Sequence, residues 1–403
     1  MKSQIKSFML ACSAFFVAIA LIRFPAQSYE ASIRGLEMWW EIVFPSLLPF
    51  FVTAELLIGF GVVRFIGILC EPIMRPVFKV PGAGSFVWAM GMASGYPSGA
   101  KLTARLRQEG QLTKIEAERL VSFTNASNPL FIFAAISVGF FNDPKLGILI
   151  AVSHYVGNTL VGICMRFYGK DEERKQERFQ PVFSVKRAMQ ALHTTRVEDG
   201  RPFGKLFGDA VLSSIQTLLI IGGFIILFSV LNQLLYLVNV TPLIGSGIAI
   251  FFQLLGVTPD LTIPFISGLF EITLGAQLTS EVDTYLLQQA MCVSFILAFN
   301  GFSVQAQVAS ILAETDIPFT PYFIARLLHG VFAVVLTYML YTPLYVNNTA
   351  EQTAIPAFLQ KGDLWNDALL HMTRIGPPLT LITLLIGIFL LWAQVKRRPS
   401  KRK

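Results

Sequence analysis

Two short polar stretches interrupt otherwise apolar sequence and carry residue types that could bind a solute. Ser94–Lys101 reads Ser-Gly-Tyr-Pro-Ser-Gly-Ala-Lys, and Glu271–Gln277 reads Glu-Ile-Thr-Leu-Gly-Ala-Gln. The hydroxyls and the lysine of the first stretch can donate hydrogen bonds to a carboxylate. The carboxylate of the second can bind a cation, take a proton or pair with Lys101. Ionisable side chains inside apolar segments are costly, so these residues are candidates for function.

The first stretch has the composition of an anion site. Ser98 is placed to cap the N-terminus of a helix, whose first backbone amides would favour a negative charge. Lys101, one turn further on, adds a formal positive charge. The sequence leaves two alternatives open, since Lys101 could extend to the cytoplasmic membrane surface beside Arg105 and Arg107, and Glu271 could be exposed at the outer surface.

Two longer polar runs, Ser122–Pro129 and Asn300–Gln307, follow these stretches along the chain. Buried amides and hydroxyls cost free energy unless they find partners, so the runs predict a polar cavity or hydrogen bonds between helices. Pro129 and Gly301 should open the helices locally. The candidate substrate-binding residues are Ser94, Tyr96, Ser98, Gly99, Lys101, Asn125, Ser127, Asn128, Glu271, Thr273, Gln277, Asn300, Ser303 and Gln307.

Residue patterns typical of catalysis or metal binding are not found in the sequence. It has no phosphate-binding loop, no His-Glu-x-x-His and no Gly-x-Ser-x-Gly. Its four cysteines are scattered singly, without metal or disulfide spacing. We expect His154 and His329 to make symmetric packing contacts or hydrogen bonds. The predictions are therefore no enzyme activity, no catalytic residue, no metal and no cofactor.

The elements that must position these residues are membrane helices. Apolar residues make up 54% of the 403 residues, charged residues only 14%, and the mean hydropathy is +0.59, so lipid should meet most of the outer face. A hydrocarbon core about 30 Å thick needs roughly 20 apolar residues per helix. Runs of that kind occur at about 8 to 24, 42 to 60, 117 to 141, 146 to 168, 211 to 236, 285 to 312, 322 to 345 and 378 to 395.

Basic residues cluster between these runs rather than beside aromatics, which speaks against nucleic-acid binding. Ten Lys and Arg lie between 166 and 205, six lie in the last eight residues, and none lies from 206 to 325. The positive-inside rule then places both termini and the 169 to 205 segment in the cytoplasm. The first run has no small-x-small cleavage site after it, so we interpret it as a retained signal-anchor helix rather than a signal peptide.

The chain repeats itself at a separation of about 175 residues. His154 aligns with His329, Asn125 with Asn300, and, after one residue of slip, Gly99-Ala100-Lys101 with Gly275-Ala276-Gln277. Each copy has three full crossings, so the second enters the membrane from the opposite face. The Gly-rich pieces at 86 to 105 and 264 to 281 predict re-entrant helical hairpins, which mark binding sites in transporters; the alternative is helices lying flat on the bilayer.

The predicted fold is thus an all-α polytopic membrane protein with two inverted repeats, each with a re-entrant helical hairpin, and about eight full transmembrane helices. The expected parts are a signal-anchor helix at 1 to 30, repeat 1 at 42 to 168, a cytoplasmic linker at 169 to 205, inverted repeat 2 at 206 to 345, an extracytoplasmic loop at 346 to 377, and a last helix with a basic tail at 378 to 403.

Three stretches carry a family resemblance: the hairpin at 94 to 101, Phe-Thr-Asn-Ala-Ser-Asn-Pro at 123 to 129, and Phe-Asn-Gly-Phe-Ser at 299 to 303. They resemble the YlbJ or SpoVV family of sporulation integral membrane proteins over nearly the whole chain. That family has a nucleoside-recognition gate domain and is similar to concentrative nucleoside transporters. In those, an Asn followed by a Ser three residues on binds ribose, which Asn300 and Ser303 match. Around Lys101 the first hairpin departs from the pattern, with a lysine in place of a carboxylate.

The resemblance implies import of dipicolinate across the outer forespore membrane from the mother cell. The partners expected are a small anionic substrate and the lipid bilayer, without nucleic acid, and a homo-oligomer stays open. Two alternatives to an anion transporter or facilitator also stay open. One is a cation-coupled nucleoside-type transporter, and the other is a non-transporting membrane scaffold for spore-envelope assembly.

Overall fold

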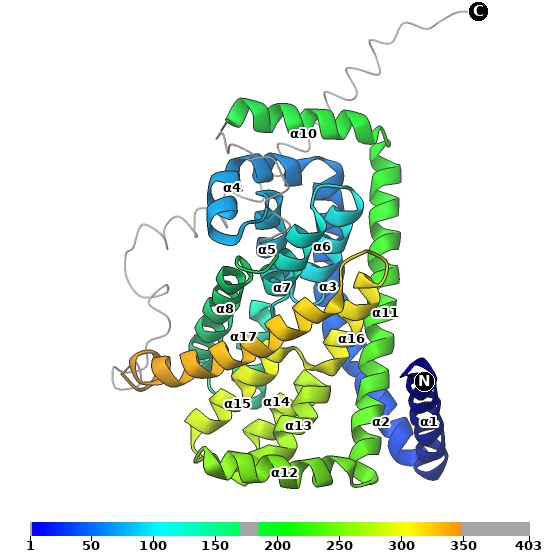
Figure 1. Cartoon of the computed structure of the whole chain (residues 1–403), viewed down its shortest axis with the longest axis vertical. Coiled ribbons are helices and arrows are strands. Elements are labelled where there is room, and N and C mark those ends of the chain that lie inside the picture. The colour runs from blue at the N-terminus through cyan, green and yellow to red at the C-terminus, as the bar shows by residue number, and fades with distance from the viewer. Residues whose placement is uncertain (1, 170–183, 348–403) are drawn as a thin grey trace, which may run out of the picture. The chain divides into compact units, whose positions relative to one another are not determined.

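The computed structural model describes residues 2–169 and 184–347, and every regular element in these ranges is helical (Figure 1). Proline and glycine mark helix ends in the first part, as expected for residues that start helices or turn the chain. Pro45 lies in the first turn of a helix, and Gly61 and Gly95 lie at helix ends. Its elements are α1 (Lys2–Arg23), α2 (Pro25–Glu37), η1 (Met38–Val43), α3 (Phe44–Gly59), α4 (Val62–Phe78), α5 (Ala83–Ser94), α6 (Ser98–Gln108), α7 (Lys114–Thr124), η2 (Phe131–Phe140) and α8 (Leu146–Met165).

The second part begins within the predicted linker, at 169 to 205, with a helix whose N-terminus is capped by the Ser184 hydroxyl. Its elements are α10 (Val185–Asp199), α11 (Phe203–Leu237), α12 (Val240–Leu254), η3 (Pro259–Leu261), α13 (Thr262–Phe270), α14 (Ile272–Ser280), α15 (Leu286–Phe299), α16 (Gly301–Leu312), α17 (Phe319–Leu340) and η4 (Tyr341–Val346). The segments η1, η2 and η4 are π-helical, a rare conformation that is frequent at functional sites.

Four helices of the described residues are long and apolar enough to cross a bilayer, or up to six if two sharply bent helix pairs are each counted as one span. The four are Leu146–Met165, Phe203–Leu237, Leu286–Leu312 and Phe319–Val346. The chain is therefore a polytopic membrane protein, but eight crossings are not confirmed. The predicted crossing at 117 to 141 is interrupted by four non-helical residues at 125–128. The predicted one at 378 to 395 lies outside the described residues.

Both Gly-rich pieces form pairs of short packed helices, α5 with α6 and α13 with α14. Glycine makes close packing possible between α13 and α14, and between α6 and the end of α7. A Cβ at Gly99 would lie 2.1 Å from the Thr124 carbonyl oxygen, and one at Gly275 would lie 2.1 Å from Gly268 Cα. The helix boundaries lie within three residues of the predicted hairpins at 86 to 105 and 264 to 281.

The base of the first hairpin is fixed by charged residues of α4 and α7. The Glu71 carboxylate accepts a hydrogen bond from the Gly82 amide and pairs with Arg75, whose guanidinium also pairs with Glu116. Glu116 in turn completes a capping box with Thr113 at the start of α7. A salt-bridged cluster thus sets where α5 begins.

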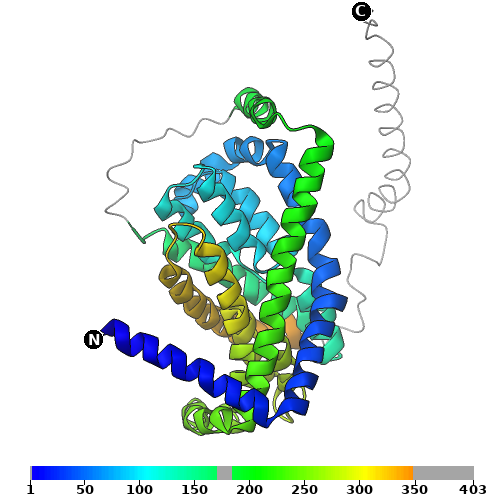
Figure 2. The ribbon, with the colours of Figure 1, turned by 90° about the vertical axis from the view of Figure 1, so that its right-hand side faces the viewer.

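Helices α4 and α12 lie crosswise at opposite ends of the long helix α11 (Figure 1). The bend between the end of α3 and α4 is 81°. Helix α10 packs on α4 at one end of α11. The basic helix α10 and helix α12, which has no Lys or Arg, therefore lie at opposite ends of α11. Figure 2 shows α2, η1 and α3 running beside α11.

The centre is built from helices of both halves that pack across each other. Helix α8 packs against α17, α7 against α17, and α15 against α8; likewise α6 packs against α16, and α14 against η2. The two hairpins and the two interrupted helices are thereby brought together in the middle of the protein.

Candidate functional site

A cavity of about 410 Å³ lies where the two hairpins meet the interrupted helices; we call it the central cavity. Its size is in the range of small-molecule sites, which are mostly apolar with a few convergent polar groups. Two of the three π-helical segments in the described residues form part of its wall, with Met38 and Val43 from η1 and Phe131, Ala134 and Ala135 from η2. Helix α11 closes one side with Ile221 and Ile225.

Half of the predicted site residues line this cavity, and they come from both halves of the chain. They are Tyr96, Ser127, Asn128, Glu271, Thr273, Ser303 and Gln307. The distribution matches the expectation that polar runs in an apolar chain surround a cavity. The remaining seven predicted residues lie elsewhere, each for a reason visible in its contacts.

Three residues of the first hairpin support its tip instead of lining the cavity. Ser94 Oγ is 2.6 Å from Ser98 Oγ, and Ser98 donates a hydrogen bond to the Gly95 carbonyl. Helix α6 has Pro97 as its N-cap, without a side-chain cap, so the predicted capping role of Ser98 is wrong. Gly99 is buried against the Thr124 carbonyl.

Lys101 lines a second cavity, of about 280 Å³, which we call the middle cavity. Its Nζ lies 3.6 Å from Glu55 Oε1 and 4.8 Å from the centre of the Phe51 ring. Glu271 does not pair with it. The relevant carboxylate comes from α3, a single acid in the apolar run 42 to 60 that the sequence analysis did not use, although an acid within such a run is itself a signal.

In the second hairpin, Glu271 is the N-cap of α14. Its carboxylate accepts hydrogen bonds from the Thr273 amide at 3.1 Å and the Leu274 amide at 2.8 Å. The helix N-terminus stabilises the negative charge, and the residue still lines the cavity. Gln277 is exposed and bonds to Glu281 at 3.3 Å, so it lies away from the cavity.

The paired asparagines of the interrupted helices meet each other behind the cavity. Asn300 has a left-handed backbone with φ of 73°, and both it and Asn125 place their side-chain amides on the Tyr322 hydroxyl, at 3.0 and 2.8 Å. With the Asn300 amide turned over, its oxygen accepts from Tyr322 and its nitrogen donates to the Leu297 carbonyl. Both asparagines stabilise the helix breaks, which occur where Pro129 and Gly301 predicted them.

A buried arginine, Arg326 on α17, closes the first helix break. Its guanidinium donates to the carbonyls of Ser122 and Asn125 and to the side-chain oxygen of Asn158 at 3.1 Å. Within the described residues it pairs with no carboxylate. Neither Arg326 nor Tyr322 is among the predicted site residues, because neither lies in a polar run; a lone arginine inside an apolar span was the available signal.

The two histidines also meet at the centre. His154 and His329 have ring centroids 4.7 Å apart, and His329 Nε2 is 2.8 Å from the His154 carbonyl oxygen. His154 Nε2 accepts from the Ser127 amide at 2.9 Å. The predicted packing and hydrogen-bonding role is confirmed.

Comparison with known proteins places these features in a family. The family model described as Gate, nucleoside recognition, matches residues 40–143 and 218–315. The sporulation integral membrane protein YlbJ of Bacillus subtilis is 54% identical over 400 residues, covering 96% of each chain. The chain belongs to the YlbJ family of sporulation integral membrane proteins.

An uncharacterized protein of Alkalihalophilus pseudofirmus is more distant, at 33% identity over 138 residues, which is 33% of this chain and 29% of that protein. No solved structure matches the chain. Membership of the YlbJ family and the apolar helices together make this an integral membrane protein with a gate domain. The gate matches cover both hairpins and both helix breaks, which are the elements around the central cavity.

Proposed function

We propose that this YlbJ-family protein is a secondary transporter or facilitator of a small anionic solute, and that it is not an enzyme. The observation that carries the proposal is the central cavity, which lies among the tips of two helical hairpins and two interrupted helices. Non-helical backbone at membrane depth is tolerated where it lines a cavity, and such paired segments form the solute site of transporters. A scaffold would have no need of a central cavity at which polar side chains of both hairpins and both interrupted helices converge.

The two halves are inverted repeats related by a twofold axis through the centre. Residues that a twofold axis relates can touch each other only beside the axis. Two aligned pairs do so: His154 with His329, and Asn125 with Asn300, whose side-chain nitrogen is 3.4 Å from the Asn125 carbonyl oxygen. Each pair is separated by 175 residues, the separation found in the sequence.

The helix pairings support the same symmetry. The packing of α6 on α16 has its counterpart in α14 on η2, and the packing of α7 on α17 has its counterpart in α15 on α8. In an eight-crossing topology, α10 faces the cytoplasm and α12 the opposite side. Cysteines introduced at Ser184 and Thr258 should then react with membrane-impermeant reagents from opposite sides; reaction from the same side would overturn the inverted repeat.

The solute we propose is dipicolinate, carried at the outer forespore membrane during sporulation, and its ring and two carboxylates are consistent with the cavity. Apolar side chains such as Phe131, Ile221 and Ile225 would pack on a ring, and Ser303 and Asn128 can donate hydrogen bonds. The positive charge that we propose for binding the carboxylates is Lys101, at the wall of the middle cavity. Charge-assisted hydrogen bonds of this kind are stronger than neutral ones.

One observation favours the second candidate, a cation-coupled nucleoside-type transporter. Among the described residues that line the central cavity, Glu271 is the only carboxylate or base, and a carboxylate suits a coupling cation. Against nucleosides, the ribose pattern is only half present at the cavity. Ser303 lines it, whereas the Asn300 side chain is used in the helix break.

The test is uptake by proteoliposomes that contain the purified protein. Accumulation of labelled dipicolinate above empty liposomes, without uptake of labelled nucleosides, is the expected result. Uptake of a nucleoside that depends on Glu271 would favour the second candidate. If neither solute is taken up, and substitutions at Ser303 and Asn128 leave the spore-envelope phenotype normal, the result would favour a non-transporting scaffold.

A further inference from the structure

Three cavities lie in a row and share walls. The central and middle cavities share Ile221 and Gln307. The middle cavity shares Glu55, Arg105 and Ser213 with a third cavity of about 460 Å³, which we call the vestibule. The row therefore leads from the hairpin tips, past Lys101, to the junction of α10 and α11.

The Glu55–Lys101 ion pair stands at the middle of this row. Both side chains are largely buried, with exposed fractions of 15% and 14%. Their separation of 3.6 Å is an ion pair without a hydrogen bond, and Lys101 Nζ has no hydrogen-bond partner among the described residues. A buried ammonium group with three unused donors can accept a new anionic partner.

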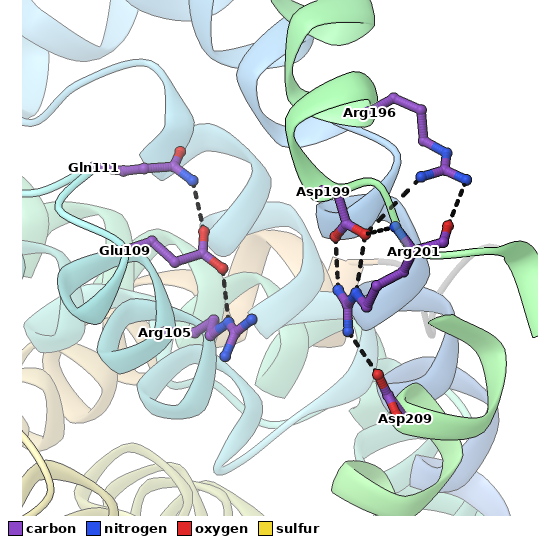
Figure 3. A network of polar contacts seen from close by, with 7 residues as sticks. All are labelled: Arg105, Glu109, Gln111, Arg196, Asp199, Arg201 and Asp209. Atoms are coloured by element: carbon purple, nitrogen blue, oxygen red, sulfur yellow. Dashed lines mark hydrogen bonds and ion pairs between the residues drawn. The ribbon is translucent and has the colours of Figure 1, made fainter. Parts of the chain in front are cut away.

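Two bases along the vestibule, Arg105 and Arg201, are held more tightly. Figure 3 shows two separate groups of contacts there, one at the end of α6 and one at the α10–α11 junction. Arg105 bonds to Glu109 at 2.7 Å, and Arg201 bonds to Asp199 at 2.7 Å and to Asp209 at 2.9 Å. Arg64, which also lines the vestibule, is paired loosely with Glu198 at 3.8 Å, but its side chain is 43% exposed. Among these described bases, Lys101 is thus the buried one that a passing anion can recruit at the least cost.

Glu55 has other polar groups nearby that it can contact when an anion binds Lys101. Ser213 Oγ donates to Glu55 Oε1 at 3.4 Å, and Arg105 lies one turn beyond Lys101 on α6 and lines the same two cavities as Glu55. Phe51, which faces the ammonium group, stabilises Lys101 by a cation–π contact while the carboxylates exchange.

We propose that Glu55 and Lys101 form a charge-exchange gate between the vestibule and the central cavity. An anionic solute that enters from the α10 side takes the place of Glu55 at Lys101, Glu55 turns toward Ser213 and Arg105, and the solute passes Gln307 into the central cavity. One carboxylate replaces another, so no buried charge is left without a partner, which would otherwise be strongly unfavourable. A neutral or cationic solute cannot make this exchange.

The gate rests on the proposed transport of an anion, but its test does not require that dipicolinate be the solute. A single cysteine at Thr273, on the central cavity, is introduced into a variant from which the four native cysteines have been removed. Its reaction rate is measured with anionic sulfonatoethyl methanethiosulfonate and cationic trimethylammonioethyl methanethiosulfonate, added to sealed vesicles that expose the α10 side. A cysteine at Thr195, which lines the vestibule, is the matched control.

We expect the anionic reagent to reach position 273 preferentially, and Lys101→Gln to lower that preference by about tenfold or more, the effect typical of a charged cleft. Glu55→Gln, which removes the competing carboxylate, should raise it. Labelling at position 195 should change in neither variant. Should Lys101→Gln fail to fold, Glu55→Gln decides alone.

An anion preference at position 273 that is the same in all three proteins would overturn the gate. Failure of wild-type proteoliposomes to take up dipicolinate, with the expected labelling preferences intact, would overturn the proposed solute and leave the gate standing.

Discussion

The two hairpins have the same architecture and opposite chemistry. In α13–α14 a carboxylate, Glu271, sits at a helix N-terminus, where two backbone amides stabilise it. In α5–α6 a lysine sits one turn inside the helix, where the N-terminal dipole opposes it, so α3 must supply the counter-charge of Glu55. The second site is therefore built locally, whereas the first depends on a neighbouring helix and can be opened by separating two side chains.

The two helix breaks differ in the same sense. The break after α15 is closed mainly from within, because Asn300 and Gly301 adopt positive φ and Gln305 bonds to the Phe299 carbonyl at 3.0 Å. The break after α7 is longer and its carbonyls are bonded by Arg326 and Asn158 from other helices. The first half thus relies on long-range contacts where the second relies on backbone conformation.

The largest effect should come from removing the arginine at the first break. Arg326→Leu leaves the Ser122 and Asn125 carbonyls and the Asn158 side chain without their donors, at roughly 1–3 kcal/mol each. Gln305→Leu removes a single bond at the second break and should cost about 1 kcal/mol. Thermal unfolding in detergent measures both, and equal losses would contradict the difference between the breaks.

Close packing should affect both hairpins alike. Gly99→Ala and Gly275→Ala each insert a Cβ about where a backbone atom already lies, so each should destabilise the protein by roughly 1–3 kcal/mol. Gly223→Ala on α11, where nothing lies within 4 Å of the added carbon, is the control and should be near neutral. If one hairpin tolerates alanine as Gly223 does, the two are not built alike.

Neutralising the capping carboxylate should have a moderate effect. Glu271→Gln removes the favourable interaction between a negative charge and the α14 N-terminus, worth about 0.3–1 kcal/mol, up to about 2 kcal/mol in partly buried sites. Glu281→Gln, at the other end of α14, is the control because its position does not favour a negative charge. Unfolding temperatures that drop equally for both variants would remove the special role of Glu271.

The smallest effect concerns an ion pair at the wall of the vestibule, between Asp199 and Arg201, which lie outside the membrane-spanning helices. Arg201, hydrogen-bonded to Asp199, holds the pKa of that carboxyl below its usual range. Because the folded pKa is lowered, the pair stabilises the α10–α11 junction above the ordinary Asp pKa of about 3.9, and this stabilisation is lost as the pH falls through the lowered value. Solvent exposure of the pair keeps the effect small.

A spin label at Val197, an exposed position on α10, should therefore become more mobile only at acid pH. In Asp199→Asn the mobility should be higher already at neutral pH and should not change with acidification. A label that responds to pH equally with and without Asp199 would show that the pair does not hold the junction.

Much of the site was predictable because it depends on local preferences. Gly and Pro residues placed both hairpins and both helix breaks, since these residues constrain the backbone wherever they occur. The 175-residue repeat aligned His154 with His329, and the two side chains are in contact. Polar runs in apolar sequence correctly indicated a cavity, and seven of the fourteen named side chains line it.

What the sequence could not decide is which polar group each side chain meets. Ser98 looked like a helix cap but bonds to Gly95, because the hairpin turn brings that carbonyl within reach. Lys101 finds Glu55, 46 residues away, and Arg326 finds the carbonyl of Asn125, 201 residues away. Hydropathy and backbone propensity act within a few residues, so they fix where helices begin, break and end. Only the packing of distant helices, which brings charges and carbonyls into contact, decided that Lys101 faces a carboxylate between two cavities and that an arginine holds the first break.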